Sequence, residues 1–63
     1  MRLKLREVRE AKFVTQVELA KLAGVSETTI VRLEAGTHNP RISTVRRLAA
    51  ALGVEPGELV ADG

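Results

Sequence analysis

The chain has 63 residues, with ten Lys and Arg, eight Asp and Glu, and a net charge of +2. A chain this short has room for one domain with one small core. It has no cysteine, which excludes disulfides and thiolate metal sites. No apolar run approaches the roughly 20 residues of a bilayer helix, and the charged start is unlike a signal peptide. We therefore expect a cytoplasmic protein that makes no membrane contact.

The basic residues are unevenly distributed. They gather near the start of the chain and again after residue 40: Arg2, Lys4, Arg6, Arg9 and Lys12, then Arg41, Arg46 and Arg47. A local basic surface attracts phosphate even when the total charge is small. Basic residues also commonly solvate exposed helix faces, so the charge pattern alone favours neither interpretation.

The first predicted helix covers residues 3–12. Four side chains follow the spacing of one helical stripe: Leu5, Val8, Arg9 and Lys12. Phe13, the only aromatic residue, comes next. A phenylalanine adopts positive φ reluctantly, so either the helix ends differently here or the site is strained. We interpret Phe13 as a partly exposed residue that caps the core, and we expect Val14 to be buried.

Residues 15–33 predict two short helices joined by a tight turn. Thr15 is the N-cap of the first, and Gly24 ends it in a left-handed conformation. Its buried side is predicted to comprise Leu19, Ala20, Leu22 and Ala23. Val25 should be buried in the turn, and Ser26 is the next N-cap. We assign to the small side chain of Ala20 the close approach of the two helices.

The second of these helices separates into two faces at about 100° per residue. The inner half comprises Thr29, Ile30, Leu33 and Glu34, and the outer half comprises Glu27, Thr28, Val31 and Arg32. Arg9 lies on the inward stripe of the first helix and needs a partner there. We therefore predict a structural ion pair between Arg9 and Glu34.

Residues 35 and 36 end that helix, and residues 37–41 form a polar loop in which Pro40 keeps Asn39 out of the helical region. A fourth helix follows and stops at Gly53; its apolar stripe is Ile42, Val45, Leu48, Ala49 and Leu52. Glu55 then caps a last turn that starts with Pro56 and carries Leu59 and Val60. Residues 61–63 are expected to fray.

Residues 16–33 resemble the helix-turn-helix of the phage-repressor and Cro type, also called the xenobiotic-response-element type. The resemblance covers residues 3–60, and further matching positions are Leu5, Val8, Arg9, Glu34, Gly36, Asn39-Pro40, Leu48-Ala49 and Leu52-Gly53-Val54. It implies an all-α, compact five-helix bundle like that of the lambda repressor, with residues 1–63 forming one DNA-binding domain around a core at 3–60. The Arg9–Glu34 pair is also implied. Phe13 departs from the glycine that is usual in the family.

For this fold, the exposed face of the helix at residues 27–35 would read bases in the major groove. The expected base contacts are Glu27, Thr28, Val31 and Arg32. Arg32 suits guanine, Thr28 offers a hydroxyl or a methyl group, and Val31 suits the thymine methyl. Glu27 has three alternatives: it accepts from cytosine N4, pairs with Arg32, or stabilises the first helical turn.

Phosphate contacts are expected at the ends of the helices. The candidates are Gln16, Ser26, Thr37, Asn39 and Arg41. Gln16 lies at the start of a helix, where free N–H groups favour an anion. In the family this glutamine typically binds a backbone phosphate and braces the recognition helix. Arg41 replaces a more usual small polar cap, and a phosphate contact would explain it.

The sequence thus predicts a sequence-specific binder of double-stranded DNA that acts as a transcriptional regulator, a repressor. We expect a homodimer, with Val54, Leu59, Val60 and the end of the fourth helix as candidates for its interface or for the core. The alternative is a protein-interaction module of the same fold, such as an antitoxin or bridging factor, whose partner is a toxin or another regulator. His38 is the only histidine and lies in a loop, so we expect no metal, no cofactor and no enzymatic activity.

Overall fold

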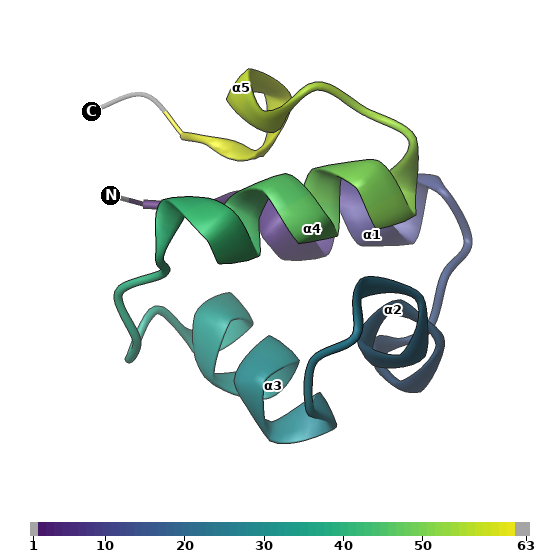
Figure 1. Ribbon diagram of the computed structural model, residues 1–63, viewed down its shortest axis with the longest axis horizontal. Coiled ribbons are helices and arrows are strands. Elements are labelled where there is room, and N and C mark those ends of the chain that lie inside the picture. Colours follow the sequence, from purple (N-terminus) through teal and green to yellow (C-terminus); the bar gives the residue numbers. More distant parts are fainter. Residues whose placement is uncertain (1, 62–63) are drawn as a thin grey trace.

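Five helices form the described part of the chain, which is residues 2–61 of a computed structural model. They are α1 (Leu5–Ala11), α2 (Gln16–Ala23), α3 (Glu27–Ala35), α4 (Ile42–Leu52) and α5 (Pro56–Leu59). Helix α4 lies between α5 on one side and α2 and α3 on the other (Figure 1). This arrangement confirms the predicted all-α bundle. Across residues 2–61, no helix has the length and apolar character needed to cross a membrane.

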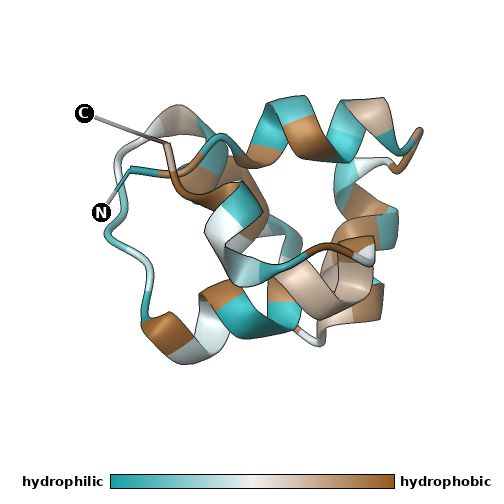
Figure 2. Cartoon of the chain, turned by 90° about the horizontal axis from the view of Figure 1, so that it is seen from above, coloured by the Kyte–Doolittle hydropathy of each residue, from teal (hydrophilic) through white to brown (hydrophobic). Residues whose placement is uncertain are grey.

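Each helix contributes one fully buried large side chain to a single core. These side chains are Leu5, Leu19, Ile30, Leu48 and Leu59. Ala20 is 5% exposed and belongs to the same cluster. Figure 2 accordingly shows hydrophobic and hydrophilic residues interspersed along the helical ribbon. Short helices of this kind depend on shared burial for most of their stability.

The N-caps predicted for α2 and α3 are confirmed. The Thr15 hydroxyl accepts from the backbone N–H of Glu18 (3.1 Å), and the Glu18 carboxylate accepts in return from the N–H of Thr15 (3.0 Å). The Ser26 hydroxyl accepts from the N–H of Thr29 (3.1 Å). Between these helices Gly24 has φ of +71°, a conformation that glycine adopts without strain. Local chemistry therefore sets both ends of the turn.

The two chain ends differ from their predicted structure. Helix α1 covers Leu5–Ala11, and the predicted range 3–12 was too long at both ends. Leu3 pairs with Val60 in an isolated antiparallel bridge, which the sequence pattern did not indicate. The N–H of Ala61 donates to Arg2 O (2.8 Å), so Ala61 is held and does not fray. Residues 62 and 63, also predicted to fray, lie outside the described residues.

Several predicted core positions are exposed. Leu22 is 64% exposed because it lies about 105° around α2 from the centre of the buried arc of Leu19, Ala20 and Ala23. Ile42 is 62% exposed because it begins α4 and lies about 70° from the centre of the buried stripe. Lys12 is also exposed. Val14 and Val25 are half-buried, packing against the core from its edge.

Phe13 was predicted to cap the core, and that prediction is wrong. The side chain is 93% exposed, so the ring packs against no part of the described core. Its backbone has φ of +58°, the one positive value among the described residues other than glycine. The strained alternative raised by the sequence is therefore the one that the structure adopts.

Candidate nucleic-acid interface

Helix α3 presents its predicted outer half to solvent. Glu27, Thr28, Val31 and Arg32 are all exposed, and Val31 retains 45% of its accessible surface. On the opposite side of the helix, Ile30 and Leu33 are buried in the core. The four candidate base-contacting side chains therefore lie on one solvent-facing side of a helix that is anchored from behind.

The predicted ion pair between Arg9 and Glu34 is present and fixes α3 to α1. Nε of Arg9 donates to Oε2 of Glu34 (2.6 Å), and Nη2 donates to Oε1 (3.1 Å). The two side chains are only 11% and 6% exposed. The hydrogen bond to Glu34 raises the pKa of the Arg9 guanidinium, so the charge persists at all accessible pH values. Bidentate geometry of this kind also restricts rotation of α3.

Two further hydrogen bonds extend this pair into a network. Nη1 of Arg9 donates to the backbone oxygen of Val14 (2.9 Å), which ties the pair to the loop between α1 and α2. Nε2 of Gln16 donates to Oε1 of Glu34 (3.1 Å). Gln16 begins α2, so the network joins α1, α2 and α3 through one carboxylate. The same amide nitrogen carries a second hydrogen that can also be donated.

The predicted phosphate-contacting residues lie around α3. Ser26 immediately precedes α3, and its hydroxyl is engaged by Thr29 as described above. Thr37 follows α3, and its hydroxyl donates to the backbone oxygen of Arg32 (3.3 Å). Asn39 and Arg41 lie in the loop that leads to α4 and are exposed. Ser26 therefore lies at the start of α3, and Thr37, Asn39 and Arg41 follow its end.

The start of α4 lacks the side-chain acceptor that the starts of α2 and α3 possess. Arg41 is its N-cap residue and makes no capping hydrogen bond through its side chain, and the first turn contains no acidic residue. The first N–H groups of a helix need acceptors and carry positive partial charge. Together with the Arg41 cation, this helix start favours an anion.

Residues 5–59 match the helix-turn-helix family. The chain belongs to this family, in its phage-repressor and Cro type. The restriction-modification controller protein C.AhdI from Aeromonas hydrophila is similar in structure. It has a TM-score of 0.86 and 39% identity, over 89% of this chain and 85% of that one.

Two curated helix-turn-helix relatives show the extent of the sequence similarity. The cryptic phage CTXphi transcriptional repressor RstR of Vibrio cholerae is 39% identical over 59 residues, which is 94% of this chain. The chain spans only about half of that repressor, 53% of its length. An uncharacterized HTH-type transcriptional regulator of Methanothermobacter thermautotrophicus is 44% identical over 55 residues, covering 87% of this chain and 80% of the relative.

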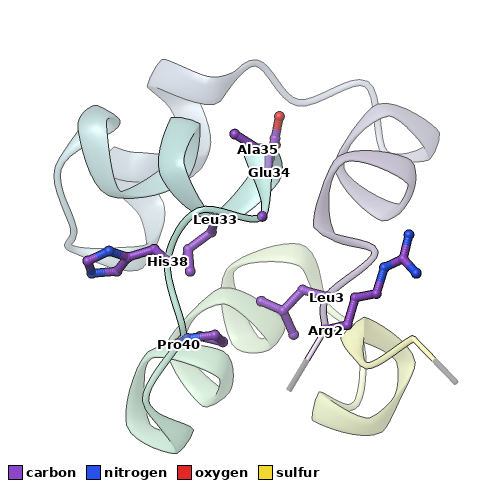
Figure 3. Close-up of a pocket in the computed structure, with 8 residues that line it drawn as sticks. Arg2, Leu3, Leu33, Glu34, Ala35, His38 and Pro40 are labelled. Carbon is purple, nitrogen blue, oxygen red and sulfur yellow. The ribbon is translucent and has the colours of Figure 1, made fainter. Parts of the chain in front are cut away.

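A pocket of about 320 Å³ lies where the C-terminal end of α3 meets the N-terminal segment. It is lined by Arg2, Leu3, Leu33, Glu34, Ala35, Gly36, His38 and Pro40. In Figure 3 the side chains of Arg2 and His38 extend in opposite directions, and neither points at the other. The Glu34 carboxylate is already paired with Arg9. The pocket therefore does not bring its titratable groups together. In residues 2–61, no three His, Asp or Glu side chains lie together as a metal site requires.

The candidate dimer residues near the C-terminus have different environments. Leu59 is fully buried and belongs to the core, which removes it from any interface. Val54 is half-buried against the core, and Val60 is half-buried in its bridge with Leu3. Exposed apolar surface at this end comes from Ile42, which the sequence placed in the core.

Proposed function

We propose that this helix-turn-helix domain binds double-stranded DNA sequence-specifically, with α3 in the major groove, and acts as a transcriptional repressor. The observation that carries the proposal is the outer face of α3, where four exposed side chains lie on a helix whose inner side is held by buried Ile30 and Leu33 and by hydrogen bonds to Glu34. A rigid helix limits the entropy lost when its side chains engage bases. Among the similar proteins, RstR is named as a transcriptional repressor, which supports this role.

Base reading is assigned to the four residues of the outer face. Arg32 donates to O6 and N7 of guanine, a pairing worth about 1–3 kcal/mol of discrimination. Thr28 contacts a base edge through its hydroxyl or methyl group, and the exposed side chain of Val31 contacts a thymine methyl. Glu27 accepts from cytosine N4. DNA phosphates repel this carboxylate, so Glu27 contributes to selectivity among base sequences more than to the overall affinity for DNA.

Phosphate binding is assigned to Gln16, Ser26, Thr37, Asn39 and Arg41. Gln16 uses its second amide hydrogen and the free N–H groups at the start of α2. Arg41 adds a cation at the uncapped start of α4. These contacts position the domain on the duplex and contribute no base readout. The pairing of Gln16 with Glu34 would couple the phosphate grip to the orientation of α3.

We further propose a homodimer that places two α3 helices on a two-fold related operator. A groove of about 320 Å³ between α4 and α5 is the best candidate interface; its lining is Ile42, Val45, Arg46, Pro56, Gly57 and Val60. Apolar Ile42 is exposed there, and basic Arg46 lies beside it on α4. A two-fold axis through this groove would bring the apolar lining of one copy against the same residues of the other. A monomeric mass by sedimentation equilibrium at tens of micromolar would refute the dimer.

The proposed setting follows from the proposed ligand. We place the activity in the cytoplasm, where a prokaryotic regulator meets duplex DNA, and we propose that the domain binds without catalysing a reaction. Residues 1–63 would act as one DNA-binding domain with its folded core at 3–60. No cofactor is needed for this function, because the proposed contacts all come from protein side chains and helix termini.

Binding-site selection from random duplex DNA tests the proposal directly. We expect enrichment of one motif, repeated as a two-fold related pair of half-sites, and affinity for it that falls steeply with salt because phosphate contacts release counterions. Recovery of no motif would reject sequence-specific binding. A salt-insensitive partner captured in place of DNA would favour the alternative of a protein-interaction module, such as an antitoxin or bridging factor.

A further inference from the structure

Helices α1 to α4 all end in the same backbone motif, which makes one exception visible. At each ending, one backbone N–H donates to the carbonyl oxygen of the residue five positions earlier. The N–H of the residue before it donates to the carbonyl oxygen three positions earlier, and the two bonds together form a Schellman motif. At α2, α3 and α4 the left-handed residue of this motif is glycine: Gly24, Gly36 and Gly53. At α1 it is Phe13, whose N–H donates to Glu10 O (3.0 Å), while the next N–H, from Val14, donates to Arg9 O (3.2 Å).

The ring of Phe13 makes no stabilising contact with the described residues that would offset the energy of this left-handed conformation. Left-handed backbone is unfavourable for a residue with a Cβ atom, and the other three endings avoid the cost through glycine. The side chain is 93% exposed, so no packing among residues 2–61 compensates for the strain. A strained residue that also exposes a large apolar surface is a recurrent property of binding positions.

The position of Phe13 relates it to the proposed DNA interface. Phe13 precedes Gln16, the first residue of α2, by three positions, so their Cα atoms are at most about 11 Å apart. The loop between them is held by the hydrogen bond from Arg9 Nη1 to Val14 O (2.9 Å). The strained conformation is therefore anchored to the network that orients α3 and Gln16.

We propose that Phe13 is a DNA-backbone contact whose ring packs against a deoxyribose of the strand that α2 grips. The inference rests on the proposed function, and it adds a residue that the family resemblance did not indicate. The sugar is the apolar component of the backbone between phosphates, and it is the part that an exposed aromatic ring can cover. This contact is sequence-independent and adds affinity without base discrimination.

The test uses opposite expected effects on folding and on binding. Phe13→Gly and Phe13→Asn relieve the left-handed strain, so each should raise the Tm by about 2–6 °C. Each should also weaken binding to the selected operator and to random duplex alike, by about five- to tenfold, since the buried apolar area is lost. The slope of affinity against salt should be unchanged because no phosphate contact is removed.

Two variants complete the experiment. Phe13→Tyr retains the ring and should retain the affinity. Leu22→Ala removes another exposed apolar side chain of the domain and should leave binding unchanged. If Phe13→Gly binds duplex DNA with unchanged affinity, the inference is overturned, because the ring then makes no contact with DNA. A loss confined to the operator, or a flattened salt slope, also overturns it. If the wild-type chain binds no duplex, the proposed function fails first.

Discussion

Nε of Arg9 lies 2.6 Å from Oε2 of Glu34, although the two residues are 25 positions apart in the chain. This contact joins the first helix to the inner side of α3 and buries both charges. Gln16 donates to the other carboxylate oxygen of Glu34, so α2 is attached at the same point. One carboxylate on α3 therefore links this helix to both α1 and α2.

Removal of that carboxylate should destabilise the whole domain. We expect Glu34→Ala to lower the free energy of unfolding by about 3–5 kcal/mol, because the Arg9 charge is left buried without its partner. Denaturant unfolding followed by circular dichroism measures the loss. A double change, Arg9→Met with Glu34→Met, should recover part of it because no charge is stranded.

The matched control is the exposed ion pair on α1. Nε of Arg6 lies 3.7 Å from Oε2 of Glu10, with side chains 69% and 57% exposed. Arg6→Ala should lower the free energy of unfolding by at most about 0.5 kcal/mol, since solvent screens such a pair. Similar losses for Arg6→Ala and Glu34→Ala would show that the burial of the Arg9–Glu34 pair is unimportant.

Arg32 should contribute specificity more than general affinity. Arg32→Ala should cost about 1–3 kcal/mol on the selected operator and clearly less on random duplex, because a base contact is lost. Fluorescence anisotropy at fixed salt compares the two duplexes. Arg47→Ala removes an equal charge from the exposed face of α4 and should affect neither strongly. Equal losses on both duplexes for Arg32→Ala would assign it to phosphate.

Arg41 and Gln16 should differ in the salt dependence of their effects. Arg41→Ala should weaken binding to all duplexes and reduce the slope of log affinity against log salt by about one unit. Gln16→Ala should also weaken binding to all duplexes but leave the slope near its wild-type value, since its amide is neutral. A titration at four salt concentrations distinguishes them. An unchanged slope for Arg41→Ala excludes its proposed phosphate contact.

The capping box of α2 makes a small acid-sensitive contribution to stability. The N–H of Thr15 donates to the Glu18 carboxylate, and this bond lowers the pKa of Glu18 below its ordinary value of 4.5. Since the unfolded chain binds this proton more readily, the stabilisation is complete above pH 4.5 and is lost as the pH falls through the folded pKa. The Tm difference between wild type and Glu18→Gln should therefore shrink below pH 4.5. A constant difference from pH 7 to 3 would contradict this.

Substitution of two glycines, Gly24 and Gly57, distinguishes the effect of backbone strain from the effect of a steric clash. A Cβ atom at either Gly24 or Gly57 would meet nothing within 4 Å, but only Gly24 has positive φ, at +71°. Gly24→Ala should therefore lower the free energy of unfolding by about 1–2 kcal/mol. Gly57→Ala, within helix α5, should raise it by about 0.5–1 kcal/mol. Thermal unfolding measures both, and equal effects of the same sign would reject this explanation.

Much of the helix-turn-helix was predictable because its determinants act over a few residues. Thr15 and Ser26 cap the helices that follow them, and Gly24 ends the helix before it, each through hydrogen bonds or dihedral preferences within one turn. The outer face of α3 followed from helical periodicity alone. The Arg9–Glu34 pair could also be predicted from the sequence, since a charge on an apolar stripe requires an opposite charge.

Positions without such local determinants were predicted wrongly or not at all. Leu22 and Ile42 continue apolar patterns, yet both are exposed because no other helix covers their sides. The pairing of Leu3 with Val60 joins residues from the two ends of the chain, and neither segment has a recognisable strand pattern. Phe13 was correctly identified as unusual, but its almost complete exposure depends on the path of the loop around it.

Local hydrogen bonding and periodicity were thus sufficient to place the helices, the turn and the polar face of α3. The assembled bundle decided which apolar residues are covered and which three helices share the Glu34 carboxylate. The physical reason is the range of the forces. Caps, left-handed turns and helical stripes act within a few residues, whereas burial depends on which distant surfaces meet, and a periodic pattern does not specify its partner.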